Sequence, residues 1–417
     1  MMARILLKSL NVSKPGLGAV STIRNRYGAN DIVDRKYSTS SDEEVRQLKT
    51  INLASLKRGT GGRSSFNGMV VSIFGCTGFL GKYLAYKLGK IGSQMIFCYR
   101  GDAYDTINLK PSGDLGQVLF HFYDIRDENA IRNAVRYSNV VVNLVGREWE
   151  TNNFKFKDVH VDGARRIARV AREMGVERLI HLSAMNVSPN PEPIFYKSGS
   201  QFLKSKYYGE LAVLEEFPNA TIIRPADMYG QADHFLWYYQ HFWRRQLHSL
   251  PVWKKGEKTI KAPVFAGDVA QAIVNAAKDH QSAGRIYQAV GPHRYRLSEI
   301  LDYFHRVWHR DNHVWQYKRT DMRYDPFFQF KIWATEKFRI ANPIGELHRE
   351  RVEREYVDDV ILEGVPTLED LGVNLTLMEN QVPFDSKAYV SYAYYVPKPG
   401  EYPEYGRPKP LGENEEI

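Results

Sequence analysis

Short apolar runs alternate with amphipathic segments through most of the chain. The runs are rich in β-branched and aromatic residues, which is typical of buried strands. They cover Val70–Phe74, Gln94–Tyr99, Gln117–Phe122, Val140–Val145, Arg178–Leu182 and Thr221–Arg224. Apolar positions with helical spacing lie between most of them, at Phe79, Leu80, Tyr83, Leu84 and Leu88 and over Ala130–Val135, Val159–Met174 and Phe202–Phe217. This alternation predicts an α/β fold, a Rossmann-type doubly wound parallel sheet covered by helices on both faces.

The first run ends in a glycine-rich turn, Gly75-Cys76-Thr77-Gly78-Phe79-Leu80-Gly81. Glycines with this spacing between a strand and a helix are typical of a dinucleotide site. Gly75 would allow the tight turn, Gly78 would let a pyrophosphate approach the backbone, and Gly81 would let the helix pack close to the strand. The helix N-terminus would offer its free N–H groups to the phosphates. The alternative is a glycine-rich turn without a ligand, but the flanking strand and helix favour the dinucleotide.

The second run ends at Tyr99-Arg100, where the adenosine ribose of a dinucleotide normally lies. An acidic residue there would hold the 2′-hydroxyl of NADH, whereas arginine suits the 2′-phosphate of NADPH. We therefore expect NADPH as the cofactor, held by Arg100, and regard FAD or NADH as less favoured. The alternative is that Arg100 is an ordinary surface arginine.

An ordered set of segments resembles the extended or atypical short-chain dehydrogenase/reductases. The set is Gly75-x-x-Gly78-x-x-Gly81, Asp124-Ile125-Arg126-Asp127, Asn143-Leu144-Val145-Gly146, Leu182-Ser183-Ala184, Ser205-Lys206-x-x-Gly209-Glu210, Arg224-Pro225-x-x-x-Tyr229-Gly230 and Phe265-Ala266-Gly267-Asp268-Val269-Ala270. The resemblance covers about 66–290 and implies a nicotinamide nucleotide site. The cofactor-binding residues that it implies are Gly75, Thr77, Gly78, Phe79, Leu80, Gly81, Arg100, Asp124, Ile125, Leu144, Val145, Gly146, Ser183, Lys206, Pro225 and Met228.

Three segments are similar to one branch of that superfamily, the NADPH-binding accessory subunits of mitochondrial respiratory complex I. They are Tyr99-Arg100-Gly101-Asp102-x-Tyr104-Asp105, Gly113-Asp114-Leu115-Gly116-Gln117 and Asn143-Leu144-Val145-Gly146-Arg147-Glu148-Trp149-Glu150-Thr151. The resemblance implies a protein on the matrix side of the mitochondrial inner membrane, with other complex I subunits as partners. Its implied role is to support assembly or stability where the matrix and membrane arms join.

The chain departs from the enzyme pattern at one position. The short-chain dehydrogenases place a tyrosine, the general acid and base, four residues before a lysine on one helix, with a serine one strand earlier. Ser183 and Lys206 match this pattern, but Phe202 occupies the tyrosine position and has no hydroxyl. We therefore expect a non-catalytic protein that holds its nucleotide. The alternative is an active NADP-dependent short-chain reductase or epimerase of the mitochondrial matrix.

The N-terminus resembles a mitochondrial transit peptide. Residues 1–37 contain seven basic and two acidic residues, and removing them would lower the net charge from +9 to +4. Arg35-Lys36-Tyr37-Ser38 resembles a matrix-processing site that is cleaved after Tyr37. The basic composition therefore argues little for nucleic-acid binding, and we expect none. The alternative is a disordered basic arm of a cytosolic protein.

The remaining residues suggest a division into domains. We expect an N-terminal extension at 38–66 and the nucleotide-binding domain at 67–290, with a lid insertion around 231–263. A smaller C-terminal lobe would follow at 291–340 and an extended docking arm at 341–417, where prolines and tyrosines alternate near the end. No apolar run is long enough to span a membrane, and we predict no metal site. Aromatic and basic residues over Tyr324–Arg339 would suit either a peripheral contact with the inner membrane or a lid over the cleft.

Overall fold

The computed structural model describes residues 57–194, 199–246, 248–310, 317–338, 344–391, 394–395, 398, 400–401 and 405–412. These residues belong to one compact unit, Lys49–Ile417. The transit-peptide prediction for 1–37, its cleavage after Tyr37 and most of the extension at 38–66 lie outside the described residues.

A seven-stranded parallel sheet forms the centre of the described unit, which confirms the predicted fold class. Its strands are β1 (Val70–Phe74), β2 (Gln94–Tyr99), β3 (Val118–Phe122), β4 (Val140–Asn143), β5 (Arg178–Leu182), β6 (Thr221–Pro225) and β11 (Ile286–Ala289). The order across the sheet is β11-β6-β5-β4-β1-β2-β3. Strand order therefore reverses beside β1, because β2 lies on one side of it and β4 on the other. A crevice at the carboxyl ends of such strands is the usual ligand site of doubly wound sheets.

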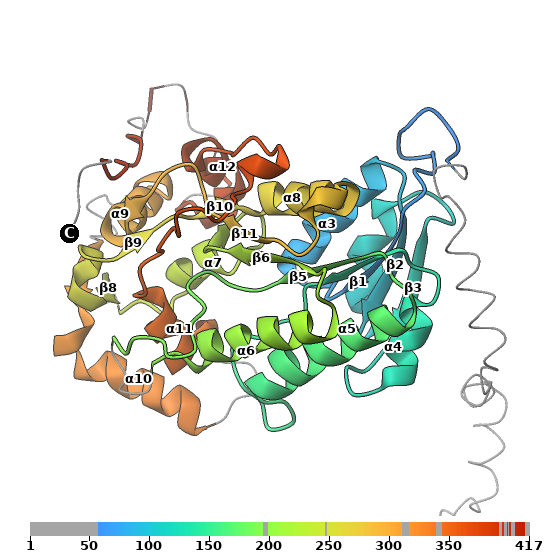
Figure 1. Cartoon of the computed structure of the whole chain (residues 1–417). Helices are drawn as coiled ribbons and strands as arrows, with labels where there is room; N and C mark the ends of the chain where they lie inside the picture. The colour runs from blue at the N-terminus through green and yellow to red at the C-terminus, as the bar shows by residue number, and fades with distance from the viewer. Residues whose placement is uncertain are drawn as a thin grey trace, which may run out of the picture. The chain divides into compact units, whose positions relative to one another are not determined.

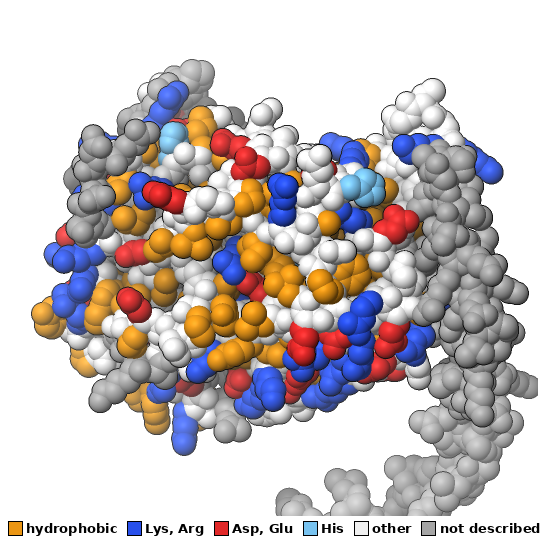
Figure 2. Space-filling model, in the orientation of Figure 1, with side chains coloured by type: hydrophobic (Ala, Val, Ile, Leu, Met, Phe, Trp, Pro, Cys, Tyr) orange, Lys and Arg blue, Asp and Glu red, His pale blue; other side chains and the backbone are white. Residues whose placement is uncertain are grey.

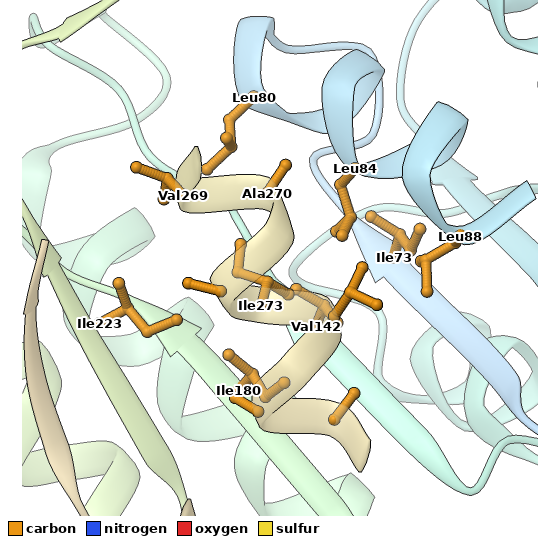
Figure 3. Packing of buried hydrophobic residues seen from close by; sticks show 14 of the residues in the cluster. Ile73, Leu80, Leu84, Leu88, Val142, Ile180, Ile223, Val269, Ala270 and Ile273 are labelled. Carbon is orange, nitrogen blue, oxygen red and sulfur yellow. The ribbon is translucent and has the colours of Figure 1, made fainter. Parts of the chain in front are cut away.

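Helices cover both faces of the sheet (Figure 1). The helices on one face are α3 (Phe79–Lys90) and α8 (Ala266–Lys278), and those on the other are α4 (Glu128–Val135), α5 (Ala164–Glu173) and α6 (Gln201–Glu216). Leu80, Leu84 and Leu88 of α3 pack with apolar residues of α8 and of the strands in one buried cluster (Figure 3). The predicted helix over Val159–Met174 is divided into a π-helical segment, η4 (Lys157–Gly163), and α5.

Ion pairs join the helices of the second face on their solvent side. Arg132 pairs with Glu173 at 2.9 Å and Arg172 with Glu216 at 2.8 Å, which links α4 to α5 and α5 to α6. Basic and acidic side chains are intermixed over α4 and α5 in Figure 2. Such exposed pairs contribute little stability, about 0–1 kcal/mol each, so the buried apolar clusters hold the layers together.

A smaller group of elements surrounds a second apolar cluster that contains Trp308, Phe304 and Phe328. Its strands are the pairs β7 (Met228–Tyr229) with β10 (Val264–Phe265), β8 (Ser249–Val252) with β13 (Lys318–Asp321), and β9 (Ile260–Lys261) with β12 (Tyr295–Arg296). Its α-helices are α7 (Phe235–Gln240), α9 (Leu297–Val307), α10 (Pro326–Lys337), α11 (Arg349–Glu355) and α12 (Met378–Asp385). Short helical turns complete the described unit: η3 (Ala103–Ser112), η5 (Trp253–Gly256), η6 (His280–Ser282), η7 (Met322–Tyr324), η8 (Ile344–Glu346), η9 (Glu369–Leu371) and η10 (Lys387–Tyr389).

Part of the expected docking arm is helical. Residues 344–391 contain α11 and α12, and Val352, Met378 and Val382 are buried in the second apolar cluster. These two helices disfavour extended chain over 349–355 and 378–385, and the division into domains stays a prediction. The sequence favoured an exposed arm because α11 is rich in charged residues, which usually face solvent. In the structure, however, Arg351, Glu353 and Glu355 are buried.

No helix among the described residues is both long and apolar enough to cross a membrane.

Close packing of α6 on η4 requires Gly209. A Cβ added there would lie 2.3 Å from the backbone oxygen of His160. We predict that Gly209→Ala lowers the free energy of unfolding by about 1–3 kcal/mol, the usual cost of overpacking, as measured by denaturant unfolding. Gly62→Ala is the control, because a Cβ at Gly62 meets no atom within 4 Å. Equal stability of the two variants would contradict the prediction.

Candidate nucleotide-binding site

A cavity of about 650 Å³ lies at the carboxyl ends of the central strands. The predicted site residues in its lining are Gly75, Thr77, Gly78, Phe79, Leu80, Gly81, Arg100, Ile125, Leu144, Val145, Gly146, Ser183, Lys206, Pro225 and Met228. Asp124 is the exception, because its carboxylate accepts a hydrogen bond from the Arg126 N–H at 2.8 Å and does not line the cavity. The structure thus brings together residues that are far apart in sequence, in a volume typical of ligand pockets.

The glycine turn has the geometry that its sequence predicts. Gly75 has φ +81°, and a Cβ there would lie 3.0 Å from the backbone of Leu144. A Cβ at Gly81 would lie 2.4 Å from the carbonyl oxygen of Cys76, so α3 packs against the turn itself. Gly78 caps α3 without a side-chain hydrogen bond. The N-terminal N–H groups of α3 therefore meet the cavity without a capping side chain, as an anion site requires.

Arginines gather at the end of the cavity next to β2. The Arg100 guanidinium lies 4.8 Å from the ring centroid of Phe154, and that of Arg126 lies 4.1 Å from the same ring. Arg147 also lines the cavity; burial, and then the charge of Arg100, lower its pKa. Sequence reasoning assigned no role to Arg147, although it directly follows Gly146 in a quoted motif. Two guanidiniums in one wall make this end suited to an anion.

Ser183 and Lys206 line another part of the cavity. The Lys206 ammonium donates a hydrogen bond to the Leu182 carbonyl oxygen at 3.1 Å, and burial lowers the pKa of Lys206 to about 8. A Cβ at Gly146 would lie 3.3 Å from the Lys206 nitrogen, so the loop after β4 passes directly beside it. The Ser183 hydroxyl is buried and has no hydrogen-bond partner among the described residues. A buried polar group of this kind in a cavity wall suits a ligand.

Phe202 lies one turn before Lys206 on α6, and both side chains line the cavity, as the sequence analysis expected. The Phe202 ring packs edge-on against His160 at 5.2 Å between centroids. The Arg354 guanidinium lies 4.3 Å from the Phe202 ring centroid. Tyr207 and Tyr208 do not line the cavity, and Tyr196 lies outside the described residues.

Charged residues to which the sequence analysis gave no role also line the cavity. They are Glu148, Asp227, Lys261, Arg351, Arg354 and Asp359. Lys261 lies 3.3 Å from Asp227 and 3.7 Å from Asp359, and its nitrogen donates to the Arg354 carbonyl oxygen at 3.4 Å. These residues come from loops, from β9 and from α11, with no shared spacing, and only Glu148 is named in a motif of the sequence analysis.

The predicted lid segment contributes His234 and Phe235 to the cavity wall. Phe235, Tyr238 and Tyr239 of α7 are buried, which agrees with the interpretation of this segment as a packed cover. A hydrogen bond with Glu346 raises the pKa of His234.

The outer face of α10 is exposed and aromatic. The exposed fractions are 61% for Phe327, 58% for Phe330, 48% for Trp333 and 76% for Phe338. This face does not line the nucleotide cavity, which disfavours the lid interpretation for 324–339. Peripheral contact with the inner membrane stays a prediction, with this face as the candidate surface.

Comparisons of this chain with known proteins agree with a nucleotide-binding fold. The model of the NAD dependent epimerase/dehydratase family matches residues 71–289. The Mus musculus protein named NADH dehydrogenase (ubiquinone) 1 alpha subcomplex subunit 9, mitochondrial, is 42% identical over 375 residues, 90% of either chain. The Neurospora crassa NADH-ubiquinone oxidoreductase 40 kDa subunit, mitochondrial, is 34% identical over 81% of this chain and 84% of that protein.

Among solved structures, the triphenylmethane reductase of Citrobacter matches 76% of this chain and 99% of its own, with a TM-score of 0.56 and 14% identity. The crystal structure of gox2253 matches 77% of this chain and 97% of its own, with a TM-score of 0.53 and 17% identity. These two likenesses show the fold alone. The chain belongs to the NAD dependent epimerase/dehydratase family and, within it, to the family of alpha subcomplex subunit 9 proteins of mitochondrial NADH dehydrogenase.

Proposed function

We propose that this protein is a non-catalytic accessory subunit of mitochondrial NADH:ubiquinone oxidoreductase, complex I, on the matrix side of the inner membrane. It would hold NADPH as a structural ligand and support assembly or stability where the matrix and membrane arms join. The names of the relatives support the assembly. The observation that carries the non-catalytic role is Phe202, which lines the cavity one turn from Lys206 where a proton donor would stand.

The surroundings of Phe202 support a held nucleotide over a reacting one. General acid–base catalysis is worth about 10²–10⁴-fold in rate, and a phenyl ring cannot supply it. The ring is 6% exposed, and the Arg354 guanidinium covers it. Beyond it, α11 and the Lys261 ion pairs form the wall where a reacting molecule would have to lie. The geometry therefore favours binding without proton transfer.

The arginine end of the cavity supports NADPH over NADH. Bound NADPH would supply a hydride donor, but the residues that line this cavity are suited to binding it without reaction. Arg100 and Arg147 would form charge-assisted hydrogen bonds with the 2′-phosphate. The α3 N-terminus would face the pyrophosphate, and Ser183 and Lys206 would meet the nicotinamide half. FAD and NADH share the pyrophosphate but lack the 2′-phosphate, so the arginine pair would gain nothing from them.

One observation favours an active NADP-dependent reductase or epimerase instead. Burial lowers the pKa of Lys206 to about 8, closer to neutral than that of an exposed lysine. Ser183 beside it would still orient a substrate oxygen. Steady-state turnover distinguishes the two functions.

Removing the positive charge at Arg100 should change the nucleotide preference. We predict that Arg100→Asp weakens NADPH binding by about 10- to 150-fold, the effect of losing a charge-assisted hydrogen bond of about 1.5–3 kcal/mol. NADH binding should be affected less, because NADH has no 2′-phosphate. Fluorescence titration of the full chain with both nucleotides measures this. Arg294→Asp, at an exposed position that does not line the cavity, is the control. An unchanged ratio of NADPH to NADH affinity would show that Arg100 has no role.

The wild-type chain should bind NADPH without consuming it. We predict no steady-state oxidation of NADPH with carbonyl substrates, monitored by nicotinamide absorbance, because Phe202 offers no proton. Robust turnover that disappears in Lys206→Ala would contradict the non-catalytic role and favour the reductase.

Loss of the nucleotide should reduce assembly. A carboxylate at Gly78 would repel the pyrophosphate, while within the protein a Cβ there meets only the Gly75 oxygen, at 3.3 Å. We predict that Gly78→Asp lowers the amount and melting temperature of assembled complex I, because a ligand bound only by the native state stabilises it. Native gels and thermal melting test this, with Gly62→Asp as control. Normal assembly of a nucleotide-free Gly78→Asp variant would show that the NADPH is dispensable for structure.

A further inference from the structure

Glu148 lies where the loop after β4 meets helix α11. It follows Gly146 and Arg147, which line the nucleotide cavity. Its carboxylate accepts hydrogen bonds from Arg351 at 2.7 Å and from Arg354 at 2.5 Å. Its backbone carbonyl oxygen lies 2.9 Å from the Nε2 atom of His348, which caps the N-terminal end of α11. One residue thus makes side-chain and backbone contacts to the same distant segment.

These contacts are partly shielded from solvent. The exposed fractions of the side chains are 28% for Glu148, 8% for Arg351 and 15% for Arg354. Burial by itself would raise the pKa of Glu148, but the Arg351 and Arg354 guanidiniums outweigh it and hold that pKa well below its usual range. The carboxylate is therefore ionised at physiological pH, and removing it would leave two guanidiniums close together in a poorly solvated place.

The same helix reaches the other end of the site. A carboxylate oxygen of Glu350 accepts hydrogen bonds from the Phe202 N–H at 3.1 Å and from the Ser200 hydroxyl at 3.0 Å. Arg354, which binds Glu148, also covers the Phe202 ring. Helix α11 therefore joins the loop 144–149 to the start of α6, and both elements carry residues that line the nucleotide cavity.

We propose that Glu148 is a positioning residue of the nucleotide site, through which packing of α11 and binding of the nucleotide stabilise each other. This inference rests on the proposed nucleotide-holding function. Held by Arg351 and Arg354, Glu148 keeps the adjacent Gly146 and Arg147 at the cavity wall. Because coupling between two binding events is reciprocal, the bound nucleotide in turn holds α11 in place. The packing of α11 would therefore differ between the NADPH-bound and the nucleotide-free protein.

The test uses the full chain and the variant Glu148→Gln, which keeps the side-chain shape and removes the charge. We expect NADPH affinity, measured by fluorescence titration, to fall about tenfold, within the usual range of coupling between sites. The ratio of NADPH to NADH affinity should fall less than in Arg100→Asp, because Arg147 moves with the loop while Arg100 keeps its place. Hydrogen exchange of the α11 amides should slow when NADPH binds the wild type, and this NADPH-dependent slowing should be lost in the variant.

A matched control and a second variant keep the test decisive. Glu173→Gln breaks the ion pair with Arg132 at 2.9 Å, away from the cavity, and should change neither quantity. Arg354→Lys keeps the charge but loses the forked guanidinium, and it should bind NADPH more weakly than the wild type and better than Glu148→Gln. If Glu148→Gln does not fold, wild-type affinity in Arg354→Lys would contradict the inference. The double variant Glu148→Gln/Arg354→Gln should lose little more affinity than Glu148→Gln alone, because the two side chains act as a pair.

Three outcomes would overturn the inference. Wild-type affinity in Glu148→Gln would show that the residue does not position the site. Weaker binding with unchanged, NADPH-dependent exchange in α11 would show that Glu148 acts without α11. Absence of NADPH binding by the wild type would overturn the proposed function together with this inference, whereas the first two outcomes leave that function intact.

Discussion

The site depends on the parallel pairing of β1 with β2 on one side and β4 on the other. After β1 the chain crosses to α3 on one face, and after β4 it crosses to η4 and α5 on the other, so the two connections separate and leave a crevice. The crevice keeps its shape because α3 begins immediately at the turn. Positive φ at Gly75 and the absence of a Cβ at Gly81 allow this approach. A side chain at either position would move the helix N-terminus away from the place where the phosphates are proposed to bind.

The second constraint is electrostatic. Buried and half-buried charges lie around the cavity, and each has partners of opposite charge: Glu148 lies between two arginines, and Lys261 lies between Asp227 and Asp359. Burying such groups costs free energy that their mutual attraction offsets only with good geometry. These pairs therefore determine how the C-terminal segment packs, and they are weak evidence for a large gain in stability. They fix where α11 lies, next to Phe202 and to the loop after β4.

Together, the two constraints give the proposed function a physical basis. A dinucleotide in this cavity would contact the glycine turn, the loop after β4 and the start of α6, which are far apart in the chain. A ligand that only the folded state binds stabilises that state by mass action. With a phenyl ring where a proton donor would be needed, the contribution of the nucleotide would be to hold these elements together. The exposed aromatic face of α10 would then be presented on a scaffold of fixed shape.

The sequence by itself determined six of the seven strands of the sheet, the glycine turn and nearly all of the proposed nucleotide contacts, whereas β11 was not predicted. Strand and helix periodicity are local properties, and the turn has a spacing that few other structures require, so Gly75, Gly78, Gly81 and Lys206 could be placed without coordinates. The sequence predicted the helix over 159–174 but not its π-helical start, because the spacing of apolar residues does not distinguish an α-helix from a π-helix. Asp124 was included from a motif, but its carboxylate turns back to the Arg126 N–H. Only the tertiary structure decided that 344–391 folds back and that Glu148, Arg351 and Arg354 meet at the cavity. Charged residues on a short helix predict solvent exposure, and whether they are instead paired and buried depends on partners about 200 residues away.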